Sequence, residues 1–204
     1  MSDDEQKKII ECLVKFVDHQ VPVYPGTGKY GTAQTIEMTK FAQKCGAEGA
    51  LVIMPYYLIP HKGAVVNHFK KLREAVGPVI GANFDPSHLV WQGIDPVSAI
   101  RYLGDSIYHV HAKDTKVDKL NTERTGVLDT KHYSDEINRS WVFRTVGFGH
   151  GEEYWRDLIS ALRLVGYDRV LSIEHEDSLM SIDEGLSKAV EFLKPMIIHD
   201  PKPT

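Results

Sequence analysis

Apolar residues recur along the chain with two periods, one typical of amphipathic helices and one of short buried strands. The first helical pattern begins with an acidic turn, and Ser2 precedes this turn as an N-cap. Its apolar positions are Ile9, Ile10, Leu13, Val14 and Val17. A helix over about residues 3–18 is therefore expected, and similar patterns predict further helices. These cover residues 35–45, 67–76, 95–103, 152–165 and 183–193.

Short apolar runs that stop at glycine, proline or polar residues separate these helices. They predict strands at residues 21–24, 50–54, 79–84, 107–112 and 170–173, and a sixth if residues 142–146 are extended. Because strands and helices alternate, with connections long enough for crossovers, we expect a parallel sheet wrapped by helices. A closed barrel needs eight strands and typically about 250 residues. The chain of 204 residues therefore predicts an α/β fold of the TIM-barrel type, with an incomplete barrel of five or six strands.

Residues 115–142 form a long polar stretch without clear periodicity. An insertion of this length in a compact domain is more often a functional loop than filler. No shift of composition, run of charge or Ser/Gly-rich linker marks a domain boundary along the chain. We therefore expect one structural domain.

Composition narrows the classes of function. The chain carries 28 acidic against 24 basic residues, a formal net charge of -4, and 42% of it is hydrophobic. This apolar share is enough for a core without disulfides, and Cys12 and Cys45 are not spaced as metal ligands or as a redox pair. The mildly acidic balance offers no basic stripe to a phosphate backbone, so we expect no nucleic-acid partner.

Nothing in the pattern predicts export or membrane insertion. The N-terminal segment MSDDEQKK is acidic and polar, whereas a signal peptide needs a basic start and an apolar run. No apolar stretch approaches the roughly 20 residues that span a bilayer. We expect a cytoplasmic protein without a membrane partner, for which chemistry on a sugar or another small molecule remains open.

Polar side chains stand at the carboxyl ends of three successive predicted strands. Asp85 ends the strand of GANFDPSH, His111 lies in IYHVHAKD and Glu174 in VLSIEHED. Parallel α/β folds place their sites at these strand ends, and the alternation of side chains lets groups of one parity share a pocket. Each residue alone is typical of a hydrogen-bonded polar group at a strand end. The three together predict a shared site.

Two carboxylates and an imidazole form a mixed set of oxygen and nitrogen donors. Such a set suits a divalent cation of the Mn, Mg, Co or Zn kind, with open positions for a substrate's oxygens. We predict Asp85, His111 and Glu174 as the metal ligands. His88, three residues after Asp85, is a further expectation as a fourth ligand or as a partner for a substrate hydroxyl.

Four motifs occur in the second part of the chain, namely NFDPSHLVWQGIDP, IYHVHAKD, RTVGFGHGEEYW and GYDRVLSIEHED. With them the stretch 72–193 resembles the C-terminal half of the sugar phosphate isomerase/epimerase family, within the xylose isomerase-like barrels. The resemblance implies that Asp85, His111 and Glu174 are metal ligands, that His88 contacts the substrate, and that Glu174 also moves protons. The roles of four further motif positions stay open. They are His109, Lys113, Asp114 and Glu176.

The first third of the chain indicates a different family. The turn GTG at residues 26–28 and the triplet PYY at residues 55–57 make it similar to the central part of the dihydrodipicolinate synthase and N-acetylneuraminate lyase family, whose members are also (β/α)8 barrels. That family's chemistry depends on a Schiff-base lysine, a YNxP tyrosine and a GTTGE threonine pair, and the chain has none of these motifs. Tyr57 matches a position near that family's active site, but a structural tyrosine at a strand end is the simpler interpretation.

We interpret the chain as a chimera of a lyase-like segment, residues 1–76, and an isomerase/epimerase-like segment, residues 77–204, within one structural domain. In the isomerase family the first metal ligand and second acid/base is a glutamate on the strand before NFDPSH. The corresponding segment ALVIMPYY has no carboxylate. His61 in the following loop can substitute for it, although a surface histidine is the simpler view. A metal would then rest on three protein ligands and bind weakly.

The expected function is that of a metal-dependent sugar or sugar-phosphate isomerase or epimerase, acting through a metal-stabilised enediolate with Glu174 as the base. The missing glutamate would impair it, and an epimerase more than an isomerase, because epimerisation usually needs an acid on each face of the substrate. Two alternatives remain open. One is a Schiff-base lyase or aldolase, against which the absent lysine argues, and the other is a chimeric scaffold without enzymatic activity.

The remaining conspicuous residues favour structural interpretations. The segment GFGHG at residues 147–151 is similar to a phosphate loop, but Glu152 and Glu153 at the start of the next helix repel an anion, which favours a structural turn. Lys113 and Arg144 are candidates for contacts with a phosphate or a carboxylate, although each is more typical of a solvated surface charge. The open strand edges of an incomplete barrel invite pairing with a second copy, so we expect a homo-oligomer.

Overall fold

The computed structural model of the chain describes residues 1–54, 62–77 and 80–200. The chain forms two units, Met1–Ile80 and Gly81–Thr204. Each unit has a hydrophobic core of its own, and the second core is the larger of the two. All residues of the site described below belong to the second unit.

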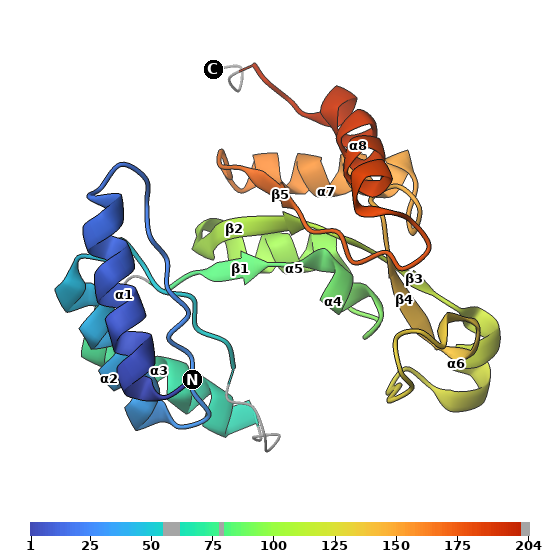
Figure 1. The fold of residues 1–204 in the computed structure, drawn as a ribbon. Helices are drawn as coiled ribbons and strands as arrows, with labels where there is room; N and C mark the ends of the chain where they lie inside the picture. The colour runs from blue at the N-terminus through green and yellow to red at the C-terminus, as the bar shows by residue number, and fades with distance from the viewer. Residues whose placement is uncertain (55–61, 78–79, 201–204) are drawn as a thin grey trace. The chain divides into compact units, whose positions relative to one another are not determined.

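Three helices make up most of the first unit, as Figure 1 shows: α1 (Asp3–Val17), α2 (Thr32–Cys45) and α3 (Lys62–Val76). Ser2 begins α1 with a capping box, in which its hydroxyl accepts a hydrogen bond from the Glu5 N–H while the Glu5 carboxylate accepts one from the Ser2 N–H. The acidic first turn thus sets the start of this helix. Buried apolar residues between α1 and α2 form the core of the unit. They are Ile10, Val14, Val23, Met38 and Ala42.

The strands expected at residues 21–24 and 50–54 are reduced to one parallel bridge between Gly26 and Leu51. A buried parallel strand needs cover on both of its faces. Val21, Leu51 and Ile53 lack that cover, since about half or more of each side chain is exposed to solvent. Apolar runs in this part of the chain therefore do not form regular strands.

The second unit is built on a parallel sheet with the strand order β1-β2-β5. The strands are β1 (Ala82–Phe84), β2 (Ile107–Ala112) and β5 (Leu171–Ile173). In the register, Asn83 pairs with His109, and His111 pairs with Ser172. The central strand β2 is therefore held on both sides, and the carboxyl ends of all three strands lie at one edge of the sheet.

Four helices of the second unit accompany this sheet. They are α4 (Pro86–Val90), α5 (Pro96–Leu103), α7 (Glu152–Leu164) and α8 (Ile182–Leu193). Helices α4 and α5 lie between β1 and β2 in the chain, α7 precedes β5, and α8 follows it. Helices α5 and α7 pack against each other behind the sheet in the view of Figure 1. Ile100, Trp155 and Leu158 are completely buried in the core that they share with β2. Burying an apolar side chain of this kind stabilises the fold by about 1.5–3 kcal/mol, so this core holds the strand ends in place.

The polar insertion is more ordered than its sequence pattern indicates. It contains the antiparallel pair β3 (Asp114–Val117) and β4 (Trp141–Arg144), with α6 (Lys119–Thr125) between them. The segment expected as a possible sixth strand is therefore extended, but it pairs with β3 in a second sheet. Three single-turn helices complete the described structure. They are η1 (Gly104–Ser106), η2 (Glu136–Asn138) and η3 (Lys194–Met196).

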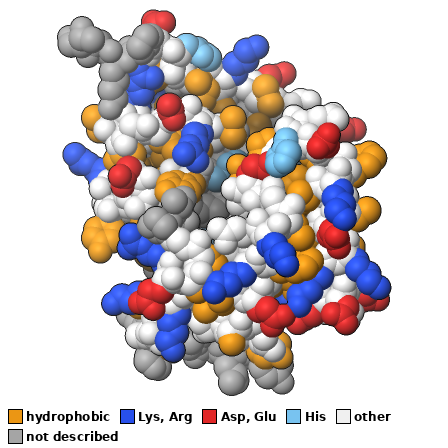
Figure 2. All heavy atoms as spheres, turned by 90° about the vertical axis from the view of Figure 1, so that its left-hand side faces the viewer, with side chains coloured by type: hydrophobic (Ala, Val, Ile, Leu, Met, Phe, Trp, Pro, Cys, Tyr) orange, Lys and Arg blue, Asp and Glu red, His pale blue; other side chains and the backbone are white. Residues whose placement is uncertain are grey.

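The architecture confirms the expected class, an α/β fold of the TIM-barrel type with a parallel sheet that is not closed within the described residues. No helix in residues 1–54, 62–77 or 80–200 has both the length and the apolar character that crossing a bilayer requires. On the face drawn in Figure 2, acidic and basic side chains are interspersed rather than gathered by sign. That face therefore presents no continuous basic stripe.

Candidate metal centre

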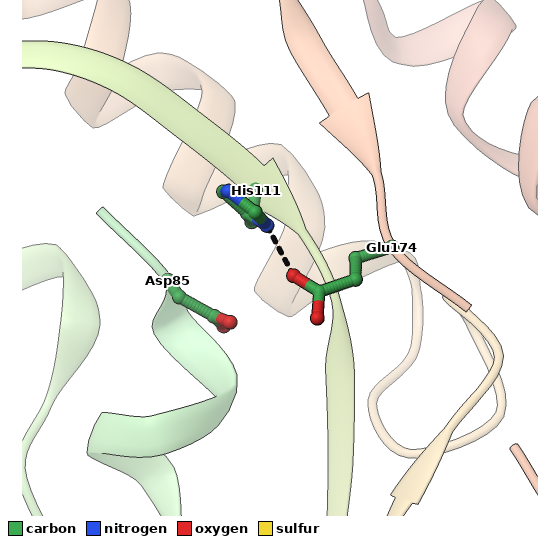
Figure 3. A group of neighbouring side chains, drawn as sticks. All are labelled: Asp85, His111 and Glu174. Atoms are coloured by element: carbon green, nitrogen blue, oxygen red, sulfur yellow. Dashed lines mark hydrogen bonds and ion pairs between the residues drawn. The ribbon is translucent and has the colours of Figure 1, made fainter. Parts of the chain in front are cut away.

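Three polar side chains from three neighbouring strands meet at the carboxyl edge of the parallel sheet (Figure 3). Asp85 follows β1, His111 lies near the end of β2, and Glu174 follows β5. One ligand atom from each lies within 4.8 Å of the others. In Figure 3 the Glu174 carboxylate points toward both the His111 ring and the Asp85 carboxylate. The sequence therefore identified a set of residues that the fold brings together.

Asp85 is oriented by the start of the short helix that follows it. It is the N-cap of α4, and its Oδ1 accepts hydrogen bonds from the backbone N–H of Ser87 at 2.9 Å and from the Ser87 hydroxyl at 2.6 Å. Pro86 occupies the first turn, where its missing N–H costs nothing. The other oxygen, Oδ2, lies 3.5 Å from Nε2 of His88.

Backbone pairing places His111 and Glu174 next to each other. The N–H of Glu174 donates to the carbonyl of Ala112 at 3.2 Å, which continues the parallel register of β2 and β5 beyond the end of β5. Nδ1 of His111 is hydrogen bonded to Oε2 of Glu174. The side chains of His109 and His111 point to the same side of β2, and their rings meet edge to face with centroids 5.4 Å apart.

Lys113 is buried and paired, so the expectation of a solvated surface charge was wrong. Its side chain is only 2% exposed, and its Nζ lies 3.0 Å from Oε1 of Glu174 and 2.5 Å from Oε2 of Glu176. The ammonium also lies 4.0 Å from the centroid of the Phe143 ring. Parity predicted that these groups share a face, but sequence could not show that two carboxylates would enclose the lysine.

The protonation states in the site follow from these contacts. Burial by itself raises the pKa of Glu174, but the hydrogen bonds and charges of Lys113 and His111 outweigh burial and lower its pKa below the ordinary value. Burial by itself lowers the pKa of Lys113, but the two glutamates outweigh it and raise that pKa. Near neutral pH the site therefore contains an ionised Glu174 and a protonated Lys113.

The donor set fits a divalent cation. Ligand bonds of about 2.0–2.2 Å place two donors of one ion at most about 4.4 Å apart. The atoms of Asp85, His111 and Glu174 lie within 4.8 Å of one another, so shifts of a few tenths of an ångström bring them to coordinating distance. Two carboxylates and one imidazole accept ions such as Mn²⁺ and Zn²⁺. In the described part of the chain, no other trio of His, Cys, Asp or Glu side chains meets this closely.

Asp114 holds the loop of residues 147–150, a role that the sequence pattern did not reveal. Its carboxylate is 1% exposed, and its Oδ2 accepts hydrogen bonds from the backbone N–H groups of Gly147, Gly149 and His150 at 3.1, 3.1 and 2.9 Å. Nδ1 of His150 lies 2.7 Å from Oδ1. The N–H groups of GFGHG thus bind the chain's own carboxylate, in agreement with the structural interpretation of this loop.

A second buried carboxylate fixes the segment after Glu174. Asp177 accepts a hydrogen bond from the Thr145 N–H at 2.7 Å and one from Nε of Arg144 at 3.2 Å. Burial raises its pKa, but these donors outweigh burial and keep the pKa below the ordinary value. Arg144 is therefore committed to an internal ion pair rather than to solvent or to a phosphate.

The other residues that the sequence singled out have different outcomes. His88 lies beside the cluster, with its half-exposed ring edge to face with Phe143 at 5.4 Å between centroids. It is not one of the three side chains whose ligand atoms converge, and its role stays a prediction. Tyr57 and His61 lie outside the described residues.

Comparisons with known proteins agree with both resemblances. The chain is 42% identical over 127 residues to the uncharacterized protein YfiH of Bacillus subtilis, a match that covers 62% of this chain and 41% of that protein. It is 36% identical over 153 residues to a 4-hydroxy-tetrahydrodipicolinate synthase of Rhodopseudomonas palustris, covering 74% of this chain and 51% of that protein. The chain thus spans about half or less of the length of these relatives.

A solved structure supports the same fold. The crystal structure of a xylose isomerase domain protein from Planctomyces limnophilus matches 93% of this chain and 65% of its own, with a TM-score of 0.57 and 18% sequence identity. The family model described as the xylose isomerase-like TIM barrel matches residues 32–196. The chain therefore belongs to the xylose isomerase-like TIM barrel family.

Proposed function

We propose that the protein is a divalent-metal-dependent isomerase or epimerase of a sugar or sugar phosphate, with Asp85, His111 and Glu174 as the metal ligands. One observation carries the proposal, the convergence of these three side chains within 4.8 Å at the carboxyl ends of three parallel strands. This edge is where enzymes with parallel α/β sheets carry their active sites. Membership in the xylose isomerase-like family supports sugar chemistry.

A divalent cation at this position would act as a Lewis acid that stabilises negative charge on a substrate's oxygens. Glu174 accepts and returns the substrate's proton, because its lowered pKa keeps it ionised near neutral pH. Lys113 holds one oxygen of that carboxylate at 3.0 Å and so fixes its direction. His88, half exposed beside Asp85, is positioned to contact a substrate hydroxyl or to add a ligand.

The proposal favours isomerisation over epimerisation. Isomerisation needs one base that removes a proton from one carbon and returns it to the neighbouring carbon, and Glu174 suffices for this. Epimerisation usually needs a second acid on the opposite face, and the segment ALVIMPYY of residues 50–57 has no carboxylate. We therefore expect aldose–ketose interconversion to exceed epimerisation.

A Schiff-base lyase is the second candidate, because a synthase of the dihydrodipicolinate type is among the relatives. Lys113 is paired with Glu174 of the candidate centre, and its environment opposes this chemistry. A Schiff-base lysine must lose its proton, whereas the two glutamates raise the pKa of Lys113. Borohydride reduction in the presence of pyruvate tests this function, and an unlabelled protein removes it.

We further propose that residues 1–76 and 77–204 derive from the two families and that the protein acts as a homo-oligomer. Strands β1 and β5 are the outer strands of the parallel sheet, each with one strand neighbour among the described residues. Unpaired edges of this kind favour association with a second copy. Analytical ultracentrifugation at micromolar concentration tests this point, and a monomer contradicts it.

Calorimetric titration with MnCl₂ is the primary test of the metal centre. We expect one weak site in the wild type, at least tenfold weaker binding in Glu174→Gln and in Asp85→Asn, and wild-type binding in the control Glu184→Gln. Glu184 is an exposed carboxylate on α8 that pairs with Lys188. Absence of Mn²⁺ binding in the wild type refutes the centre. For the loaded protein, deuterium uptake from D₂O into aldoses and ketoses, followed by NMR, tests the reaction.

A further inference from the structure

Glu176 is a carboxylate beside the candidate metal centre, and the sequence motifs left its role open. It lies two residues after Glu174, in the segment that follows β5, and about half of its side chain is exposed. Its Oε2 lies 2.5 Å from Nζ of Lys113, whose side chain is only 2% exposed. A half-exposed carboxylate thus binds a buried ammonium group that also contacts the centre.

The Lys113 ammonium has three N–H donors and is enclosed by three neighbours. Oε2 of Glu176 lies on one side, Oε1 of Glu174 lies at 3.0 Å, and the centroid of the Phe143 ring lies at 4.0 Å. Because this group has almost no contact with solvent, its charge must be balanced by its neighbours. Only the two glutamates carry a charge, so the loss of one leaves the ammonium to the other.

The two oxygens of Glu174 have different partners. Oε1 is bound to Lys113, and Oε2 is hydrogen bonded to Nδ1 of His111. Figure 3 shows this bond on the side of the carboxylate that faces the histidine ring. Oε2 is therefore the oxygen that Glu174 offers to a cation shared with His111 and Asp85. This division persists only while the ammonium stays on Oε1.

The charges of the site match a divalent cation only when Glu176 is included. Asp85, Glu174 and Glu176 carry three negative charges near neutral pH, against the single positive charge of Lys113. A divalent cation would bring the sum to zero. Without Glu176, the same cation would leave one positive charge in excess beside a buried ammonium, and like charges in a partly buried site repel each other strongly.

We propose that Glu176 is a positioning residue of the metal centre that acts through Lys113. It shares the ammonium group with Glu174, so that Lys113 orients Glu174 by one oxygen and does not compete with the cation for both. The inference rests on the proposed function, because it concerns the same centre. It gives a role to a residue outside the three converging side chains. Substituting outer partners of this kind typically changes metal affinity by about 10- to 100-fold.

Calorimetric titration of the metal-free, full-length protein with MnCl₂ tests the inference in a double-mutant cycle at one pH. The four proteins are the wild type, Glu176→Gln, Lys113→Met and the variant that carries both substitutions. Glu184→Gln is the matched control, since Glu184 is 53% exposed against 49% for Glu176 and also pairs with a lysine. If circular dichroism shows that Lys113→Met is unfolded at the temperature of the titration, Lys113→Gln replaces it in the cycle.

We expect Glu176→Gln to weaken Mn²⁺ binding about tenfold in the wild-type background, because the ammonium then has Glu174 as its one counterion. In the Lys113→Met background the same substitution should weaken binding by no more than about threefold, since only the screened charge of a half-exposed carboxylate is lost. Glu184→Gln should stay within about twofold of the wild type. A damaged fold would weaken binding equally in both backgrounds, so the difference between the backgrounds reports the role of Glu176.

Two results overturn the inference and retain the metal centre. One is equal weakening by Glu176→Gln in both backgrounds, which would make Glu176 a direct ligand or a support of the fold, and the other is unchanged Mn²⁺ binding in Glu176→Gln. Absence of Mn²⁺ binding in the wild type refutes the centre and the inference together. A coupled cycle in a protein without deuterium uptake would refute the reaction and retain the role of Glu176.

Discussion

Asp114 offers the sharpest test of how this structure holds its site. The substitution Asp114→Asn preserves the shape of the side chain and removes its charge. Asp114 directly follows Lys113 and precedes Thr115, so its carboxylate ties the end of β2 and the start of β3 to the loop of residues 147–150. The variant therefore asks whether that link is a main support of the second unit.

The structure sets the size of the effect. In the wild type, Oδ2 accepts three backbone N–H groups of the loop, while Oδ1 accepts the Thr115 N–H at 2.8 Å and contacts Nδ1 of His150 at 2.7 Å. An asparagine keeps one acceptor oxygen and replaces the other by an NH₂ donor. With the oxygen facing the loop, the NH₂ group faces the donor of Thr115. Two hydrogen bonds to a charged acceptor are lost, each worth about 1.5–3 kcal/mol, so we expect a loss of about 3–6 kcal/mol in the free energy of unfolding.

Urea denaturation followed by circular dichroism measures this loss, provided that the m-value shows two-state unfolding. Hydrogen exchange adds a local measurement, since the amides of Gly147 and Gly149 should lose protection more than those of α1 in the first unit. Asp105→Asn is the control, because Asp105 is an exposed aspartate in η1. A loss below about 1 kcal/mol, or unchanged protection of the loop amides, refutes the view that Asp114 supports this loop.

Three further predictions address the same unit. Gly149→Ala places a methyl group 2.5 Å from a carboxylate oxygen of Asp114 and from the backbone carbonyl oxygen of Thr115, so it should lower the free energy of unfolding by about 1–3 kcal/mol. The methyl group of Gly151→Ala meets nothing within 4 Å, so this control should change the free energy of unfolding by only a few tenths of a kcal/mol. Thermal melts of the two variants measure the difference. Burial opposes ionisation of Asp129, but donors from Ser140 and Lys131 outweigh burial and lower its pKa to about 2 from 3.8. The ionised Asp129 therefore contributes up to about 2 kcal/mol to the free energy of unfolding above pH 3.8, and this contribution is lost as the pH falls towards 2. In that pH range the urea midpoint of the wild type should fall with pH, and Asp129→Asn should flatten this dependence. Lys113→Met removes the cation that competes with Mn²⁺ for Glu174 and leaves the carboxylate unpaired. The metal-free variant should therefore have a lower melting temperature than the wild type, while calorimetry should record tighter Mn²⁺ binding. Weaker Mn²⁺ binding contradicts this view.

Local rules in the sequence were sufficient for most helices and for the central strand. The strand expected at residues 107–112 is β2 with the same limits, and the helix expected at residues 152–165 is α7 (Glu152–Leu164). Both patterns are long or strongly periodic, and both elements bury their apolar positions. The runs at residues 21–24 and 50–54 have the same local composition, yet only one bridge forms there, because a strand depends on neighbours that local composition does not reveal.

The candidate site shows the same division between local and distant information. The alternation of side chains and the order of the strands were enough to select Asp85, His111 and Glu174, because adjacent parallel strands end at the same edge of the sheet and residues of one parity lie on one face. The expectation for Lys113 failed because burial depends on distant partners. Its surroundings come from β4 and from the segment after β5, and no local pattern predicts which lysine such segments will enclose.

By itself, the sequence determined the class of the fold, the family and the three side chains that converge, since each of these depends on periodicity, element order or motifs that are written along the chain. Tertiary structure alone decided that Asp114 fills the glycine-rich loop and that Lys113 lies between two glutamates. The hydrogen bonds between Asp114 and this loop and the ion pairs of Lys113 with the two glutamates join residues from 33 to 63 positions apart. They form because the free energy of an ion pair depends on distance in space, which the order of residues does not record.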